Sequence, residues 1–250
     1  MVIKSLDLPV LNLFFNYASV GVYSVADTAS SVLFSMTAFS IPIISSVSEA
    51  WTKKDDIQLE KYVKISVKYP LILGIPLTVT IFTLAEPIVI GIYGVAFQGA
   101  VMPLQILIIG TFLLMFGYTL SSILIGIGKP KISGILMASA AAQYIISLFV
   151  LIPILGLNGA AVSLSLTGIT TLVLIPIFIK HNLRADIFSG LPKVLFSGAI
   201  LAGILFIIPK SNNILLIFGT VAGLVIYILL LRYMGYINQE DIELLKTIRA

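Results

Sequence analysis

The sequence predicts an all-α integral membrane protein, a polytopic helical bundle with about seven full transmembrane helices and a truncated helix in front of them. Hydrophobic residues make up 59% of the 250 residues, charged residues make up 10%, and the mean hydropathy is +1.12. Soluble domains carry about 25% charged residues. The charges are also confined: residues 51–69 hold eight of them, whereas Glu86 is the only one between residues 69 and 128. Long uncharged stretches between charged segments are typical of helices that cross a bilayer.

Seven stretches with at most one charge reach or approach the length of about 20 residues that crosses a hydrocarbon core. They are residues 22–48, 70–94, 101–127, 132–155, 159–179, 194–208 and 213–231. The shortest, 194–208, is flanked by Lys193 and Lys210, whose side chains can extend to the two interfaces. Residues 8–15 are apolar apart from Asn12 but too short to cross a bilayer, so we expect them to be the end of a span. They lack the features of a secretory signal.

The positive charges predict the orientation of these spans. If residues 22–48 run from outside to inside, fourteen of the fifteen Lys and Arg residues are cytoplasmic and only Lys210 is outside. Such an excess of cytoplasmic positive charge is the usual rule for membrane proteins. We therefore expect a multi-pass protein of the cell (cytoplasmic) membrane with a cytoplasmic C-terminus.

Residues 51–69 then form a basic loop at the inner leaflet. Leu59, Tyr62, Val63 and Val67 fall on one helical face, which predicts an amphipathic helix lying on membrane lipid. The lysines of this loop would be attracted to anionic headgroups; they are Lys53, Lys54, Lys61, Lys64 and Lys68. The alternatives are a solvated connector whose charge sets the topology, and a role in gating or in binding a partner.

The residues that catalysis needs are scarce. The chain has no Cys, and its one His, His181, lies between Lys180 and Arg184 in a predicted cytoplasmic loop. No pair of carboxylates lies at short spacing within a span, and there is no phosphate-binding Gly-rich loop and no zinc spacing. These observations favour transport or a structural role over an enzyme. We expect no cofactor, no metal and no nucleic-acid partner.

Polar residues within the spans are the candidates for a substrate path. The stretch 22–48 is the most polar, and Asp27, Ser31 and Ser35 follow one another along one helical face. An ionisable residue within a span is a functional hypothesis by default, so Asp27 either lines an aqueous path, holds a coupling cation, or is an interfacial residue. The serines line the same path or serve helix packing.

Gln143 and Tyr144 lie in the middle of a predicted span, where an amide without a hydrogen-bond partner is costly. They either line a lumen or, for Gln143, form a hydrogen bond between helices. Small residues at spacings of four, such as Gly134, Ala138 and Ala142, favour close helix packing.

Four segments in series carry a resemblance to a known family: "VGVYSVADTASSVLFSM", "LAEPIVIGIYGVAFQGAVMPLQIL", "SSILIGIGKPK" and "LIPILGLNGAAVSLSLTG". In order and spacing they resemble the carboxy-terminal half of the oligosaccharide-lipid flippases of the MATE-like MOP superfamily, the polysaccharide biosynthesis or O-antigen transporter group. The resemblance implies a fold of two six-helix lobes arranged as a V, often with two further helices. It also implies transport of undecaprenyl- or dolichol-linked glycans to the outer leaflet by alternating access.

The resemblance divides the chain into three parts. Residues 1–180 resemble the second lobe with a truncated first helix, residues 181–233 resemble the additional helix pair, and residues 234–250 form a cytoplasmic tail. The first lobe is missing, so the resemblance implies a partner chain or a missing N-terminal lobe beside the lipid-linked glycan substrate. No Lys or Arg lies within a predicted span, so basic residues for a lipid pyrophosphate would come from the other half.

Three hypotheses of function follow. The first is half of a flippase for lipid-linked oligosaccharide or polysaccharide precursors. The second is half of a cation-coupled multidrug exporter that depends on Asp27. The third is a truncated fragment or assembly partner that transports nothing.

Overall fold

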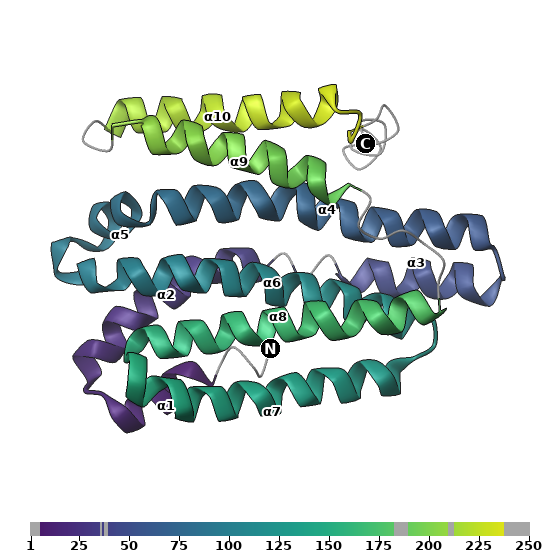
Figure 1. The fold of residues 1–250 in the computed structure, drawn as a ribbon, viewed down its shortest axis with the longest axis horizontal. Helices are drawn as coiled ribbons and strands as arrows, with labels where there is room; N and C mark the ends of the chain where they lie inside the picture. Colours follow the sequence, from purple (N-terminus) through teal and green to yellow (C-terminus); the bar gives the residue numbers. More distant parts are fainter. Residues whose placement is uncertain (1–5, 36, 38–39, 183–189, 210–212, 238–250) are drawn as a thin grey trace.

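The computed structural model describes residues 6–35, 37, 40–182, 190–209 and 213–237. Within these residues all regular secondary structure is helical (Figure 1). The helices are α1 (Asp7–Phe14), α2 (Tyr17–Ser35), α3 (Ser40–Thr52), α4 (Asp56–Thr83), α5 (Ala85–Tyr93), η3 (Val95–Ala100), α6 (Val101–Gly126), α7 (Pro130–Leu155), α8 (Leu157–Asn182), α9 (Leu191–Ile207) and α10 (Asn213–Tyr233). Lys210, the side chain of His181 and the tail from residue 238 onward lie outside the described residues.

Five helical segments among the described residues are long and apolar enough to cross a membrane. They are Asp56–Thr83, Val95–Gly126, Pro130–Leu155, Leu157–Ile179 and Leu215–Tyr233, and α9 is a shorter apolar helix. The long helices lie side by side in Figure 1, as expected for a bundle that spans a bilayer. The predicted class, an all-α polytopic membrane protein, is confirmed.

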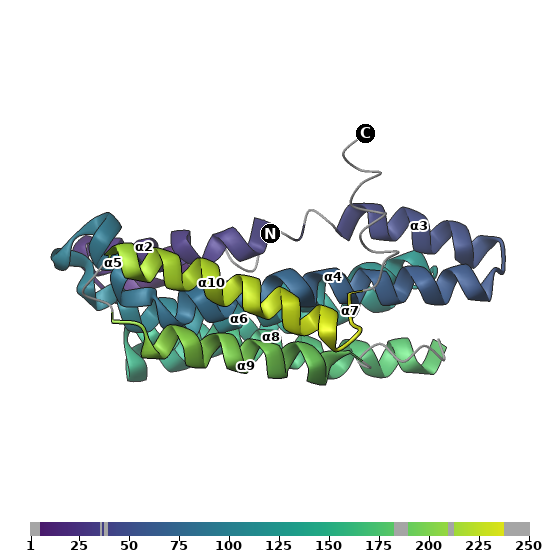
Figure 2. The same cartoon turned by 90° about the horizontal axis from the view of Figure 1, so that it is seen from above.

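Two of the predicted spans each contain residues of two helices. Residues 22–48 fall into α2 and α3, which lie apart in Figure 2, and residues 70–94 fall into α4 and α5. In both cases the second helix has a proline as its third residue, Pro42 in α3 and Pro87 in α5. Proline lacks the N–H that would continue a preceding helix but fits the first turn of a new one.

The basic loop is helical from Asp56 onward, and its apolar face is covered by other helices. α4 begins at Asp56, and the Asp55 carboxylate caps it by accepting a 3.0 Å hydrogen bond from the Gln58 N–H. Leu59, Val63 and Val67 are buried in an apolar cluster with residues of α3 and α6. The expectation that this face rests on the inner leaflet is therefore corrected: the neighbouring helices cover it.

Glycines allow α6 and α8 to pack closely at the centre of the bundle. A Cβ at Gly110 would lie 2.7 Å from the Ser165 Oγ and 2.8 Å from the Ser165 backbone nitrogen. The Ser165 hydroxyl donates to the carbonyl of Ile106 at 3.2 Å. This arrangement is typical of helix contacts in membranes, where small residues let backbones approach.

The α9–α10 hairpin covers one side of α4 (Figure 1). A Cβ at Gly198 in α9 would lie 2.8 Å from the Cγ2 of Ile75. Lys193, near the start of α9, donates a 2.8 Å hydrogen bond to the carbonyl of Met234, just after α10. A lysine in this position satisfies a carbonyl that the helix end leaves free.

Candidate functional site

The predicted polar face is present on α2. Asp27, Ser31 and Ser35 are partly or fully exposed and lie at successive turns of this helix. The hydroxyl of Ser31 donates to the carbonyl of Thr28 at 2.6 Å, and that of Ser35 donates to Val32 at 2.6 Å. These hydroxyls therefore bond within their own helix, which leaves their oxygens able to accept from a ligand or from water.

Tyr144 does not line an open path, because it is fully buried. Its hydroxyl donates to the Oδ1 of Asp7, and the hydroxyl of Tyr23 donates to the Oδ2 of the same carboxylate at 2.8 Å. Asp7 is also fully buried. One carboxylate thus connects three helices, α1, α2 and α7, which we call the Asp7 cluster: Asp7, Tyr23 and Tyr144.

Asp27 lies next to the Asp7 cluster. It follows Tyr23 by one turn of α2. The structure therefore brings together two of the predicted residues, Asp27 and Tyr144, through a carboxylate that the sequence reasoning missed. Acidic side chains within a membrane bundle are the kind of groups that exchange protons or hold cations.

Asp7 and Tyr23 had a recognisable signal in the sequence. Asp7 directly precedes the apolar stretch 8–15, and an ionisable residue inside or beside such a stretch is uncommon. Tyr23 has the polar hydroxyl that a buried acid needs. Their contact with Tyr144, which is 137 residues from Asp7, follows only from the fold.

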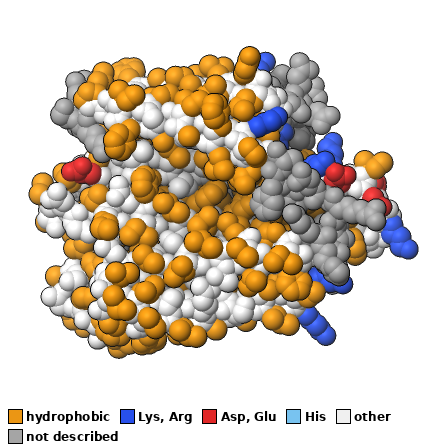
Figure 3. Space-filling view, in the orientation of Figure 1, with side chains coloured by type: hydrophobic (Ala, Val, Ile, Leu, Met, Phe, Trp, Pro, Cys, Tyr) orange, Lys and Arg blue, Asp and Glu red, His pale blue; other side chains and the backbone are white. Residues whose placement is uncertain are grey.

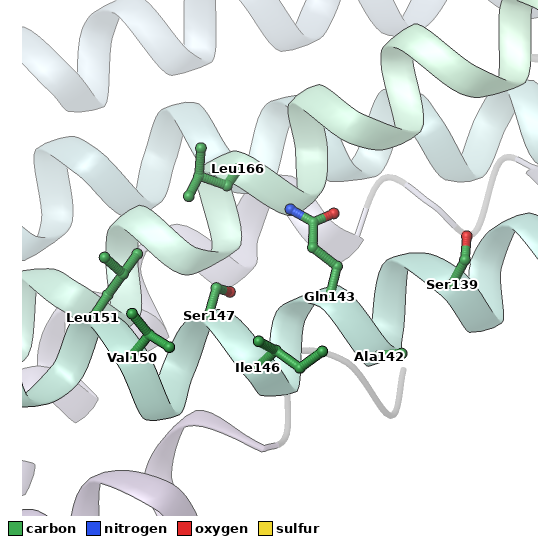
Figure 4. A pocket seen from close by; sticks show the side chains of 8 residues that line it. All are labelled: Ser139, Ala142, Gln143, Ile146, Ser147, Val150, Leu151 and Leu166. Atoms are coloured by element: carbon green, nitrogen blue, oxygen red, sulfur yellow. The ribbon is translucent and has the colours of Figure 1, made fainter.

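Gln143 lies on a different side of α7 from Tyr144, although the two residues are adjacent. It lines a groove of about 570 Å³ between α7 and α8 (Figure 4). The groove is lined by Ser139, Ala142, Gln143, Ile146, Ser147, Val150, Leu151 and Leu166. The Oε1 of Gln143 is buried and accepts no hydrogen bond from the described part of the chain. The five candidate residues therefore do not form one site.

The described basic residues gather at one end of the molecule, toward the turn between α3 and α4 (Figure 3). Two lysines of the predicted basic loop form exposed ion pairs with the residue four positions earlier, each at 2.6 Å: Lys53, in the turn after α3, with Glu49, and Lys64, in α4, with Glu60. The hydrogen bond from Lys53 lowers the pKa of Glu49. Lys68 lies 5.4 Å from the centre of the Tyr236 ring. This charged end is the one that sequence analysis assigns to the cytoplasm.

No three His, Cys, Asp or Glu residues in the part of the chain that the structure describes come together in a way that could hold a metal ion. The candidate functional features of the protein are thus the polar face of α2, the buried Asp7 cluster and the groove between α7 and α8.

The fold and these features define a multi-pass α-helical membrane protein. No protein-family model matches the chain, and no curated protein does either. Among solved structures it is similar to the lipid II flippase MurJ in an inward closed conformation, with 18% identity and a TM-score of 0.78 over 92% of this chain. It is also similar to an outward-facing multidrug resistance MATE family transporter of the MOP superfamily, with 17% identity and a TM-score of 0.63 over 90% of this chain.

A third similar structure is MATE in complex with MaD5, with 18% identity and a TM-score of 0.62 over 96% of this chain. The chain spans 50% of the MurJ chain, 58% of the outward-facing MATE chain and 64% of the MaD5-bound one. At these identities the likeness establishes the fold, which the chain shares with MOP-superfamily membrane transporters over roughly half or more of their length.

Proposed function

We propose that the chain is one lobe of a membrane transporter that moves lipid-linked oligosaccharide or polysaccharide precursors across the cytoplasmic membrane. The observation that carries this proposal is the TM-score of 0.78 with a lipid II flippase over 92% of the chain. A flippase of this kind encloses its substrate between two lobes, and this chain spans half of the similar one. The other lobe is a partner chain or a further part of the same protein.

The polar face of α2 is the proposed substrate path. A partly exposed carboxylate and exposed hydroxyls on a helix of a membrane bundle are costly against lipid, so this face is best placed against water or protein. Asp27, Ser31 and Ser35 would then contact the substrate's polar head. Gln143 is a second candidate contact for the substrate, in the groove between α7 and α8. Tyr144 would not contact the substrate but would act through its hydrogen bond to Asp7 inside the bundle. Because the predicted spans contain no Lys or Arg, the other lobe supplies positive charge for a pyrophosphate.

Deletion of the gene in its source organism tests this function. We expect surface polysaccharide to fall and the lipid-linked precursor to accumulate on the cytoplasmic side, because synthesis continues while export stops. The gene restored in its native form should reverse both effects. Unchanged surface polysaccharide and unchanged precursor levels would contradict this function and leave the multidrug exporter and the chain that transports nothing.

A cation-coupled multidrug exporter is the second candidate, and two observations favour it. The similar structures include multidrug resistance MATE transporters, and Asp27 lies one turn from Tyr23, whose hydroxyl donates to a second carboxylate, the buried Asp7. Export of a cationic dye driven by an ion gradient would then require Asp27. Dye export that is present in the wild type and lost in Asp27→Asn would support this function, and dye export unchanged in Asp27→Asn would remove it.

A further inference from the structure

The Asp7 cluster joins the short helix α1 to the rest of the bundle. Both carboxylate oxygens of Asp7 accept a hydrogen bond, one from Tyr23 in α2 and one from Tyr144 in α7. All three side chains are fully buried. Hydrogen bonds to a buried charged group are among the stronger ones in proteins, and they fix direction as well as distance.

One face of α1 also makes apolar contacts: Leu11 is fully buried, and Leu8 and Val10 are partly buried against the apolar cluster that contains Tyr23 and Tyr144. Asp7 and Leu11 are the only buried residues of this helix, whereas Leu13 is 72% exposed and Phe14 is 42% exposed. The ring of Phe14 makes an edge contact with Phe149 in α7 at 6.2 Å between centres. The Asp7 carboxylate therefore adds two directional hydrogen bonds to the apolar contacts that α1 makes with the bundle.

The same carboxylate sets the rotation of α2. Tyr23 precedes Asp27 by one turn, so the two side chains follow one row along the helix. Holding the Tyr23 hydroxyl at Asp7 fixes this row, and with it the direction of Asp27 and of Ser31, which is one turn further.

We propose that Asp7 is a positioning residue, which holds α1 in place through Tyr23 and Tyr144 and thereby aims the polar face of α2. The effect of this role on transport rests on the proposed function, in which the polar face of α2 is the substrate path. Two directional hydrogen bonds fix the orientation of α1 and α2, which the apolar contacts of α1 alone do not specify.

Chemical labelling in native membranes tests the position of α1 without any transport assay. The chain contains no Cys, so Leu11→Cys places a single buried thiol on α1. We expect slow maleimide labelling in an otherwise unchanged protein, and labelling about tenfold faster when Tyr23→Phe and Tyr144→Phe are both added, because the buried carboxylate then has no donors. Tyr233→Phe, which removes a tyrosine hydroxyl that is 91% exposed on α10, is the control and should leave the rate unchanged. Equal rates in all three proteins would overturn the proposal.

A fully apolar version of the cluster separates positioning from simple stability. The triple variant Asp7→Leu, Tyr23→Phe, Tyr144→Phe leaves no buried polar group unsatisfied, so we expect it to fold and to melt close to the wild type. We expect glycan export to be lost nevertheless, because the two directional bonds are absent. Export at the wild-type level in the triple variant would overturn the proposal.

If the triple variant does not accumulate in the membrane, the single variant Tyr144→Phe tests the proposal instead. It removes one of the two hydrogen bonds to Asp7 and keeps the one from Tyr23. Export reduced several-fold with an unchanged amount of protein supports the positioning role, and unchanged export contradicts it. Failure of the proposed function is distinguishable, because deletion of the gene would then leave export intact while the labelling rates still report on α1.

Discussion

The hydroxyl of Tyr227 in α10 donates a hydrogen bond of 3.1 Å to the carbonyl oxygen of Ile72 in α4. Within α4 this carbonyl has no N–H partner four residues later, because that residue is Pro76. Proline in a membrane helix is tolerated where a neighbouring group satisfies the freed backbone oxygen. The α9–α10 hairpin thus supplies a hydrogen bond to the backbone of α4 at the position that Pro76 leaves without a partner, in addition to its apolar contacts.

Loss of this hydroxyl should weaken the protein. We expect Tyr227→Phe to lower the free energy of unfolding by about 1 kcal/mol, because it removes one hydrogen bond and leaves a buried carbonyl unsatisfied. Thermal unfolding of the purified protein in detergent measures the change. Tyr17→Phe is the control, since Tyr17 is 88% exposed and its hydroxyl makes no hydrogen bond within the described residues. A melting temperature equal to that of the control would show that the bond contributes nothing to stability.

The close approach of α6 and α8 makes a second prediction. Gly110→Ala would place a methyl group 2.8 Å from the backbone nitrogen of Ser165, which no side-chain rotation can relieve. We expect a loss of about 1–3 kcal/mol, as for other overpacked sites. Gly134→Ala in α7 is the matched control, because a Cβ there meets no atom within 4 Å. Equal effects of the two substitutions, measured by unfolding in detergent, would contradict the packing described for α6 and α8.

The membrane class could be predicted from sequence because it depends on composition, which bilayer thickness and charge cost constrain strongly. The positions at which helices end within the apolar stretches were harder to predict than the membrane class. Pro42 and Pro87 lie inside apolar stretches, and a proline in a membrane helix is compatible with a bend as well as with a new helix. The arrangement of neighbouring helices decides between these outcomes, and a single sequence does not contain it. The covered face of Leu59 was misassigned to lipid for the same reason.

For the candidate site, the sequence predicted which residues share one helix face, but not which residues of different helices meet. The row of Asp27, Ser31 and Ser35 follows from helical periodicity, and the structure places all three on one face of α2. The role of Tyr144 could not be predicted locally, because its partner Asp7 is 137 residues away. Gln143 and Tyr144 were grouped as neighbours in sequence, yet adjacent residues on a helix point about 100° apart.

The polar face of α2 should be needed for export but not for folding. We expect Ser31→Ala combined with Ser35→Ala to reduce glycan export several-fold while the amount of protein in the membrane is unchanged, because both hydroxyls bond only to their own helix. Thr220→Ala in α10 is the control, since that hydroxyl also bonds its own helix, at 2.7 Å to Leu216. Surface polysaccharide measured in cells that carry each variant gives the answer. Export equal to that of Thr220→Ala would exclude these serines from the path.

The charge distribution predicts which end of the bundle faces the cytoplasm, and the absence of Cys makes the test simple. Ile57, beside the basic lysines at the start of α4, is 83% exposed, and Val95, after α5, is 68% exposed. Because positively charged segments stay in the cytoplasm, we expect a membrane-impermeant maleimide to label Val95→Cys in intact cells and Ile57→Cys only after permeabilisation. The cysteine-free parent is the control for background labelling. The reverse labelling pattern would place the basic end outside the cell and would contradict the predicted orientation.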